Sequence, residues 1–270
     1  MSARELQNLA RDIAARAGEL VRRRRAEGVS VAATKSSPED IVTAADRESE
    51  ELIRSLIADA RPDDGFLGEE GGREFGTTGV TWVVDPIDGT VNYLYGIDDY
   101  AVSIGVVEGS RDPREWSALA GAVYAPARDE MYVASSGGGA YRGNRRLAVN
   151  TGVDPRLALV GTGFGYDPER RRRQLAVVAG LIGDIRDIRR IGSAALDLCR
   201  IADGQLDGFY EVGLNPWDMA AGALIAREAG AQLGGLGGSP ADAHMTIAAE
   251  PELFAFLEAR LEGLGAASVF

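Results

Sequence analysis

The chain has little of three residue types on which much protein chemistry depends. Its 270 residues include one cysteine (Cys199), one histidine (His244) and, beside 28 arginines, one lysine (Lys35). A single cysteine allows no internal disulfide, and a single histidine leaves too few ligands for a histidine-bound zinc site. Cys199 also lacks the arginine six residues later that cysteine phosphatases use, since Gln205 stands there. These absences exclude disulfide scaffolds, histidine zinc enzymes and cysteine-nucleophile phosphatases.

The chain also lacks long apolar runs and an excess of positive charge. No hydrophobic segment is long enough to span a membrane, and none follows the first charged residues, so we expect neither a membrane helix nor a secretory signal. The formal net charge of −12 argues against binding to nucleic acid or anionic membranes. Two arginine runs, Arg22–Arg25 and Arg170–Arg173, lie among acidic residues in helical patterns, and we interpret them as solvated helix faces. These features predict a cytoplasmic protein.

Hydrophobic periodicity predicts an α/β fold with two lobes. Ser2 and Glu5 form a capping-box pattern before a helix that runs to about residue 26, and a second helix is expected after Asp46. In the rest of the first half, short runs of β-branched and aromatic residues predict strands at 80–84, 101–107, 119–124, 131–134 and 147–149. The second half alternates, with strands at 157–160, 185–189, 209–212 and 245–248 and helices at 168–181, 194–202, 219–228 and 251–261. Layered sheets and helices in two lobes, about 1–150 and 151–270, are expected to form one catalytic unit.

The strongest chemical signal is the segment Trp82-Val-Val-Asp-Pro-Ile-Asp-Gly-Thr-Val-Asn92. An apolar strand ends at Asp85, and Pro86 turns the chain so that Asp88 stands near the start of a helix. Two carboxylates three residues apart across a turn can converge on hard cations such as Mg²⁺, which prefer oxygen ligands. Main-chain N–H groups at a helix start then offer a seat for phosphate. Taken alone, the two aspartates could also be a helix cap and a turn residue.

Two further segments place carboxylates at the ends of structural elements. Phe66-Leu-Gly-Glu-Glu70 delivers two glutamates just before the strand, and Asn215-Pro-Trp-Asp-Met219 places Asp218 at a helix N-terminus, where the local field keeps it ionised. Asp218 alone could equally be an N-cap. Four carboxylates that each end an element make a metal cluster the better interpretation. About four negative groups plus a phosphate require two or three divalent ions.

Other phosphate-binding patterns fit the sequence less well. No GxxxxGK[ST] loop occurs, which excludes a P-loop nucleotide hydrolase. The glycines at 161, 163 and 165 have the wrong spacing for a dinucleotide fingerprint, and we interpret them as a tight strand-to-loop turn. Phosphatases with a nucleophilic aspartate use D-x-D-G-T, but here Pro86 stands two residues before Asp88, and proline cannot attack phosphorus. The spacing therefore predicts hydrolysis without a covalent phospho-enzyme.

Four ordered blocks resemble the inositol monophosphatase family over nearly the whole chain: Gly68–Glu70, Trp82–Asn92, Ile191–Glu211 and Trp217–Ala231. The resemblance implies an αβαβα layered sandwich, Mg²⁺ dependence, inhibition by lithium and often a homodimer. It also implies a set of metal ligands, namely Glu69, Asp85, the Ile87 carbonyl, Asp88 and Asp218. The sequence departs from the family in a compact segment after the first block and in a glycine-rich stretch, 231–238, where the family has a more ordinary strand.

The resemblance implies roles for further residues. Thr90 orients the attacking water together with Glu69, and the amides of Gly89 and Thr90 hold the phosphate. Lys35 and Asp46 match a mobile loop and an outer acidic residue near a further metal. The residues that match contacts to the substrate hydroxyls are Ser193, Ala194 and Glu211, with Thr162 near the same pocket.

The sequence thus predicts a Mg²⁺-dependent hydrolase of a small phosphate monoester, in which a metal-activated water attacks. Glu211 favours a neutral alcohol rich in hydroxyls over a second phosphate, because a carboxylate repels one. No basic cluster is evident for a bisphosphate. We therefore rank inositol-1-phosphate first, histidinol phosphate second, and nucleotide or other sugar phosphates behind them. The alternative from another class is a non-catalytic binding protein that keeps the fold, and the intact carboxylates argue against it.

Overall fold

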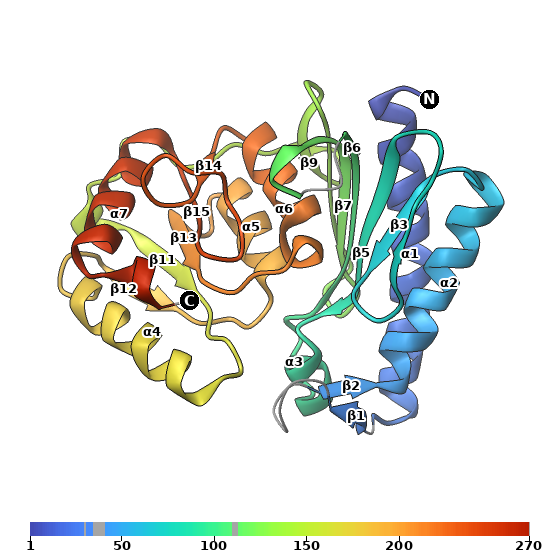
Figure 1. The fold of residues 1–270 in the computed structure, drawn as a ribbon, viewed down its shortest axis with the longest axis horizontal. Coiled ribbons are helices and arrows are strands. Elements are labelled where there is room, and N and C mark those ends of the chain that lie inside the picture. The colour runs from blue at the N-terminus through green and yellow to red at the C-terminus, as the bar shows by residue number, and fades with distance from the viewer. Residues whose placement is uncertain (30, 35–40, 110–112, 270) are drawn as a thin grey trace.

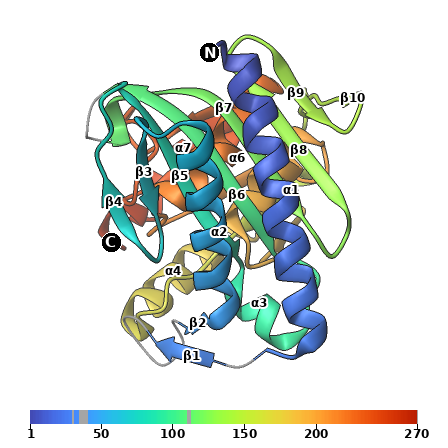
Figure 2. The ribbon, with the colours of Figure 1, turned by 90° about the vertical axis from the view of Figure 1, so that its right-hand side faces the viewer.

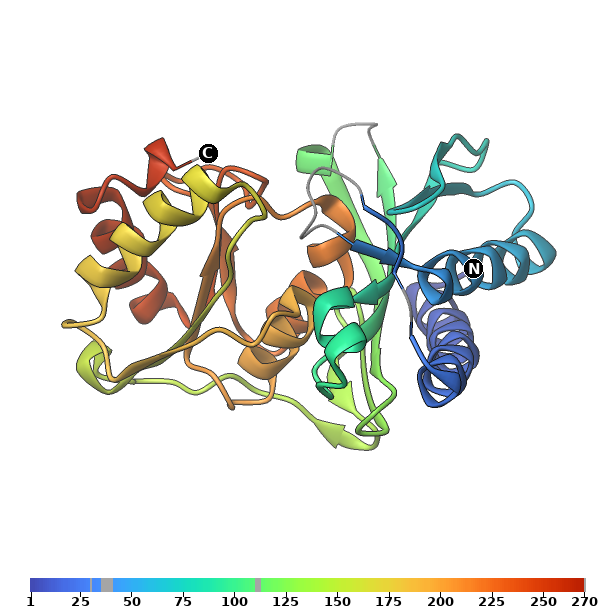
Figure 3. The ribbon, with the colours of Figure 1, turned by 90° about the horizontal axis from the view of Figure 1, so that it is seen from below.

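Two β-sheets alternate with three layers of helices in the computed structural model, which describes residues 1–29, 31–34, 41–109 and 113–269. The order across the molecule is helices, sheet, helices, sheet, helices (Figure 1, Figure 3). The predicted αβαβα sandwich is therefore confirmed. Lys35, the lysine singled out above, lies outside the described residues. Within those residues, no helix is both long and apolar enough to cross a membrane.

The first layer consists of two long helices that lie side by side on one face of the larger sheet (Figure 2), α1 (Ala3–Glu27) and α2 (Ala44–Ala60). Both begin with a capping box. In α2 the Thr43 main-chain N–H donates to the Asp46 carboxylate at 2.8 Å. The prediction that this helix begins after Asp46 is therefore wrong. The helix begins at Ala44, and Asp46 lies in its first turn, where it accepts a hydrogen bond from an N–H that has no partner within the helix.

The larger sheet has eight strands in the order β10-β9-β8-β7-β6-β5-β3-β4. All neighbours run antiparallel except β3 and β5, which are parallel. Apolar side chains of β5, β6 and β7, such as Trp82 and Ile104, pack against α1 and α2 in a buried core. The strands are β3 (Gly65–Gly68), β4 (Gly72–Glu74), β5 (Val80–Asp88), β6 (Ala101–Gly109), β7 (Trp116–Ala125), β8 (Glu130–Ser135), β9 (Gly139–Arg142) and β10 (Arg145–Arg146). A separate small sheet pairs β1 (Val31–Thr34) with β2 (Ile41–Thr43).

The middle layer is formed by two helices between the sheets (Figure 3), α5 (Ala194–Ala202) and α6 (Pro216–Glu228). Glycines in the larger sheet allow α6 to approach closely. A Cβ on Gly105 would lie 2.8 Å from the Ala220 Cβ, and one on Gly121 would lie 3.0 Å from the Ala221 carbonyl oxygen. Any side chain at these two positions would push α6 away from the sheet, and α6 carries Asp218 in its first turn.

The smaller sheet has the order β12-β11-β13-β15-β14 and is covered on its outer face by α4 (Pro168–Leu181) and α7 (Pro251–Gly263) (Figure 1). The first three strands run parallel and the last three antiparallel. Their bounds are β11 (Leu159–Thr162), β12 (Asp187–Arg189), β13 (Gly208–Glu211), β14 (Gln232–Gly234) and β15 (Thr246–Ala249). The remaining helical segments are α3 (Thr90–Tyr95) and the 3₁₀ turns Pro113–Glu115, Pro155–Leu157 and Ala266–Ser268.

Most predicted elements are present within a few residues, but the strand predicted at 147–149 is wrong. This segment joins no sheet, although Leu147 is buried. The Val149 N–H instead donates to the Ala229 carbonyl at 3.0 Å, after the end of α6. The glycine-rich stretch at 231–238 still forms the short strand β14.

Candidate active site

An irregularity at the end of β5 brings two aspartates to the same site. β5 pairs with β6 in regular register as far as Asp85, and the register shifts before Asp88. The Asp85 Oδ1 atom accepts the Ile87 N–H at 3.0 Å, which closes the turn through Pro86. Asp88 Oδ2 accepts the Ser193 hydroxyl at 2.6 Å and the Ala195 N–H at 2.7 Å. The end of β5 is therefore bonded to the start of α5.

A third carboxylate, Asp218, approaches from the first turn of α6. Its Oδ2 atom accepts the Asn215 N–H at 2.7 Å in a capping box, so Asp218 is an N-cap partner as well as part of this cluster. Carboxylate oxygens of Asp85, Asp88 and Asp218 lie within 4.8 Å of one another. Two segments of the chain, the end of β5 and the first turn of α6, thus deliver three carboxylates to one point. This donor set fits a hard divalent cation.

The electrostatics of the three carboxylates fit a site for a cation. Burial raises the pKa of Asp88 to about 6, although the hydrogen bonds from Ser193 and Ala195 oppose this. Burial also raises the pKa values of Asp85 and Asp218 well above their ordinary range, and the mutual repulsion of the acidic groups adds to it. Among the described residues no arginine forms an ion pair with any of the three. Buried carboxylates without a cationic partner are expected where a metal ion supplies the charge.

A fourth carboxylate, Glu69, follows β3 directly and lies near the three aspartates. Its N–H donates to the Val84 carbonyl at 3.2 Å, which holds it beside β5. The charge of Glu69 contributes to the raised pKa values of Asp85, Asp88 and Asp218, so the four carboxylates act on one another. The structure therefore brings together all four side chains predicted to bind metal.

The loop after β5 forms a main-chain cradle next to these carboxylates. Gly89 is the N-cap of α3 and has φ +95°, and a Cβ there would lie 2.9 Å from the Asp99 carbonyl oxygen. Glycine is therefore required at this position both for the backbone angle and for space. The Thr90 hydroxyl lies 3.0 Å from the Ile87 carbonyl oxygen and 3.2 Å from Asp46 Oδ1. Burial raises the pKa of Asp46 to about 6.

A cavity of about 530 Å³ opens beside the carboxylates and the cradle. Ser193, Ala194 and Glu211 line it, as the sequence predicted for substrate contacts. Burial raises the pKa of Glu211 well above its usual range, with nearby acidic groups adding to the effect. Thr162 is buried and borders a small neighbouring cavity. The residues predicted for substrate thus face the same space as those predicted for metal.

Several cavity residues were not predicted from the sequence, among them Arg170, Arg190 and Tyr166. Arg170 belongs to the arginine run that was interpreted as a solvated helix face. That interpretation holds for the exposed residues 171–173 but is wrong for Arg170, which is half-buried and lines the cavity. The sequence contains no local signal that separates Arg170 from the three arginines after it. Two arginines thus line a pocket for which the sequence showed no evident basic cluster.

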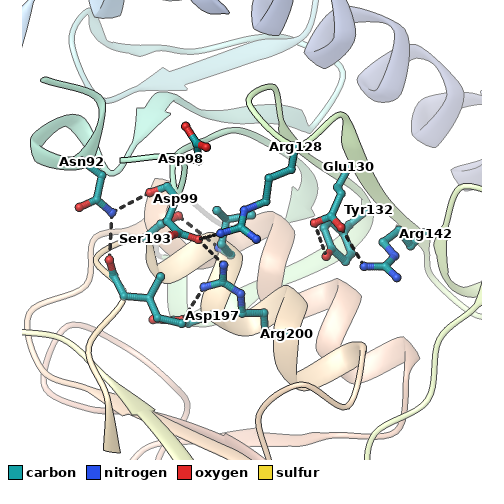
Figure 4. A network of polar contacts seen from close by, with 12 residues as sticks. Asn92, Asp98, Asp99, Arg128, Glu130, Tyr132, Arg142, Ser193, Asp197 and Arg200 are labelled. Atoms are coloured by element: carbon teal, nitrogen blue, oxygen red, sulfur yellow. Dashed lines mark hydrogen bonds and ion pairs between the residues drawn. The ribbon is translucent and has the colours of Figure 1, made fainter. Parts of the chain in front are cut away.

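A polar network fixes the start of α5 against the larger sheet (Figure 4). The Asn92 side-chain amide donates to the Asp99 carbonyl at 2.7 Å and to the Ile191 carbonyl at 2.9 Å. Arg200 of α5 donates to the Asp99 carboxylate and lies 3.6 Å from Asp197. Burial raises the pKa of Asp197 to about 8. Asn92 was not predicted as a site residue, yet it joins the loops on either side of the cradle.

Comparison with known proteins places this site in a family. A profile of the inositol monophosphatase family matches residues 2–262. The inositol-1-monophosphatase SuhB of Mycobacterium tuberculosis is 48% identical over 247 residues, which covers 84% of this chain and 83% of the relative. The solved structure of Mycobacterium tuberculosis SuhB has a TM-score of 0.82 and 42% identity, with 99% of each chain covered. A protein named Nus factor SuhB from Pasteurella multocida is 39% identical over 226 residues, with 83% of this chain and 82% of the relative covered. The chain therefore belongs to the inositol monophosphatase family, a family of phosphoric monoester hydrolases.

Proposed function

We propose that the protein hydrolyses a small phosphate monoester of a hydroxyl-rich alcohol, with inositol-1-phosphate as the first candidate, in a reaction that depends on Mg²⁺. The observation that carries this proposal is the convergence of Asp85, Asp88 and Asp218 within 4.8 Å beside the Gly89 cradle. Hard oxygen donors next to main-chain amides suit a divalent cation and a phosphate together. The ligands come from the larger sheet and from α6 of the middle layer, so we also propose that the chain works as a single catalytic unit.

The proposed roles follow from where each group lies. Glu69, Asp85, Asp88, Asp218 and the Ile87 carbonyl would hold two or three Mg²⁺ ions. When bound, such ions activate water and offset the charge of the phosphate oxygens. The N–H groups of the cradle at residues 89 and 90 would hold the phosphate, and Glu69 would orient the attacking water. No protein nucleophile is required, so no covalent intermediate forms.

Thr90 would assist Glu69, and its contact with Asp46 supports this role. A hydroxyl has one hydrogen and can donate it to one acceptor at a time. When Thr90 donates to Asp46 at 3.2 Å, its lone pairs are free to accept a hydrogen bond from the attacking water and so to orient it. Asp46 thus has a role through Thr90, in addition to the outer metal site that the family resemblance implies.

Glu211 and Ser193 support an alcohol rich in hydroxyls as the leaving group. Glu211 is half-buried, and its carboxylate lies so near the main chain that a Cβ on Gly163 would be 2.1 Å from its Oε2 atom. A carboxylate held in this way can accept hydrogen bonds from neighbouring hydroxyls of a ring. It could equally pair with an ammonium group, which keeps histidinol phosphate as the second candidate.

The test is phosphate release from a panel of monoesters by the purified protein, with and without Mg²⁺, and then with added Li⁺. We expect Mg²⁺-dependent release that is fastest for inositol-1-phosphate and that Li⁺ inhibits. An Asp218→Asn variant should lose activity, whereas Asp59→Asn, on the exposed face of α2, should keep it. If the folded protein released no phosphate from any monoester, the proposal would fail. The relative named Nus factor makes a binding role the alternative to examine in that case.

A further inference from the structure

Helix α2 buries three polar side chains on one face. Asp46, Ser49 and Glu50 are each at most 4% exposed, and spacings of three and four residues from Asp46 place them on the same side of the helix. Buried polar groups lower stability unless they are hydrogen-bonded. All three have a contact outside α2, in one of the two turns that carry Glu69 and Thr90.

Two of these contacts are with the turn at the end of β5. The Ser49 hydroxyl donates to the Pro86 carbonyl at 3.3 Å, and Asp46 Oδ1 lies 3.2 Å from the Thr90 hydroxyl. Pro86 and Thr90 stand on either side of Asp88 in the sequence. Helix α2 therefore contacts this turn both before and after the aspartate that is predicted to bind metal.

Glu50 contacts the other turn, which joins β3 to β4 and carries Glu69. The Glu50 Oε2 atom accepts the Glu70 N–H at 2.8 Å. The carboxylate comes so close to this turn that a Cβ on Gly68 would lie 2.3 Å from Oε2, and a Cβ on Gly71 would lie 2.4 Å from Oε1. The Glu50 carboxylate thus lies against the main chain on both sides of the two glutamates, where glycine leaves room for it.

Arg54, four residues later on α2, holds the Glu50 carboxylate in this orientation. Its Nη2 atom donates to Glu50 Oε1 at 3.3 Å, and its Nη1 atom donates to Glu74 of β4. Its guanidinium carbon also lies 4.4 Å from the centre of the Phe66 ring in β3. One oxygen of Glu50 therefore accepts a main-chain N–H and the other accepts a guanidinium N–H, and together these two bonds fix the carboxylate.

We propose that Glu50 is a positioning residue for the hydrolytic reaction, because it holds the turn that carries Glu69 in place relative to the turn that carries Thr90. This inference rests on the proposed function, in which Glu69 and Thr90 together orient the attacking water. Ser49 acts from the same helix through its bond to Pro86. The two groups that orient the water belong to different segments of the chain, and α2 contacts both. A shift of one segment by about 1 Å can lower the rate about 100-fold.

Substitutions at Glu50 test this role, with saturating Mg²⁺ and inositol-1-phosphate as the substrate. Glu50→Ala removes the acceptor of the Glu70 N–H and should lower kcat at least about tenfold, with KM changed by less than about twofold. Glu50→Gln keeps an oxygen that can accept this N–H and should restore most of the activity. The control is Glu51→Ala, which changes the next residue of α2, is exposed and should match wild type.

Mg²⁺ binding gives a readout that does not depend on turnover. Glu69 is a proposed metal ligand, so Glu50→Ala should weaken Mg²⁺ binding in calorimetry about tenfold, and Glu51→Ala should not. Glu50→Asp keeps the charge but is one carbon shorter, so it should show the same losses. It takes the place of Glu50→Ala if circular dichroism shows that the alanine variant does not fold.

A double-mutant cycle shows whether Glu50 acts through Glu69. In a Glu69→Gln background, Glu50→Ala should lower kcat by less than about twofold more, because the group that Glu50 positions is already lost. A full further loss in this background, or values for Glu50→Ala equal to those of Glu51→Ala, would overturn the inference, while hydrolysis by wild type would still uphold the proposed function. No hydrolysis of any monoester by wild type would overturn both.

Discussion

Replacing Asp88 with asparagine should separate the stability of the metal-free protein from its activity. In the folded protein burial raises the pKa of Asp88 to about 6, compared with 3.8 for an exposed aspartate. Ionised Asp88 therefore favours the unfolded chain. The stability associated with the protonated group is fully present below pH 3.8 and is lost as the pH rises through about 6. Over this range the loss is on the order of 2–3 kcal/mol.

Asparagine keeps the hydrogen bonds of Asp88 without its charge. Its side-chain oxygen can still accept the Ser193 hydroxyl and the Ala195 N–H. In chelator at pH 8, we expect Asp88→Asn to be more stable than wild type by about 2 kcal/mol, and at pH 4 we expect no difference. With saturating Mg²⁺ the turnover of the variant should fall at least ~100-fold, because an amide N–H₂ replaces a ligand oxygen of the cluster.

The assays are urea unfolding followed by circular dichroism at pH 4, 6 and 8 in chelator, and phosphate release with saturating Mg²⁺. The control is Asp59→Asn, which removes a charge from an exposed position and should follow wild type throughout. If Asp88→Asn and wild type lost stability in parallel between pH 4 and pH 8, Asp88 would not carry a buried charge. Near-normal turnover in the variant would remove Asp88 from the metal site.

Three further predictions concern the cradle, the substrate wall and the metal itself. Asn92→Ala removes the amide that donates to both the Asp99 and the Ile191 carbonyls. We therefore expect a loss of about 1–3 kcal/mol in unfolding free energy and a lower kcat, measured by thermal melting and steady-state kinetics. An unchanged melting curve would contradict these hydrogen bonds. Gly163→Ala puts a methyl group onto the Glu211 carboxylate and should raise KM at least about tenfold while Mg²⁺ affinity in calorimetry stays the same. Chelation should abolish phosphate release, and the rise in melting temperature on adding Mg²⁺ should be smaller at pH 5 than at pH 8, because protons compete for carboxylates with raised pKa values.

The metal end of the site could be predicted because its residues stand at the ends of strongly patterned elements. Asp85 ends an apolar strand and Asp218 begins a helix, and both kinds of position are legible from periodicity and turn residues alone. That the two would meet did not follow from their spacing of more than a hundred residues. We inferred it from carboxylates that each end an element and from the family resemblance. In the structure it depends on α6 packing closely onto the sheet at Gly105 and Gly121.

The place of Arg170 in the cavity wall could not be predicted, because this arginine differs from its neighbours only in the folded protein. Arg170 is one of four identical side chains, and its burial depends on the helix being seated beside Gly213, far along the chain. Similarly, the segment at 147–149 has the apolar, β-branched composition of a strand, but its Val149 N–H bonds to Ala229 at the end of α6. In both cases a contact distant in sequence overrides the local pattern.

The charges that line the cavity imply an order of binding. The four carboxylates would repel a phosphate dianion, while Arg170 and Arg190, which line the same cavity, would attract it. Without metal ions, the phosphate of a monoester is therefore favoured beside the arginines and not beside the carboxylates. Divalent ions bound by the carboxylates would reverse the charge there and make that place the stronger site for anions. On the roles proposed above, the metal ions thus determine where in the cavity the scissile phosphate binds, before they take any part in its hydrolysis.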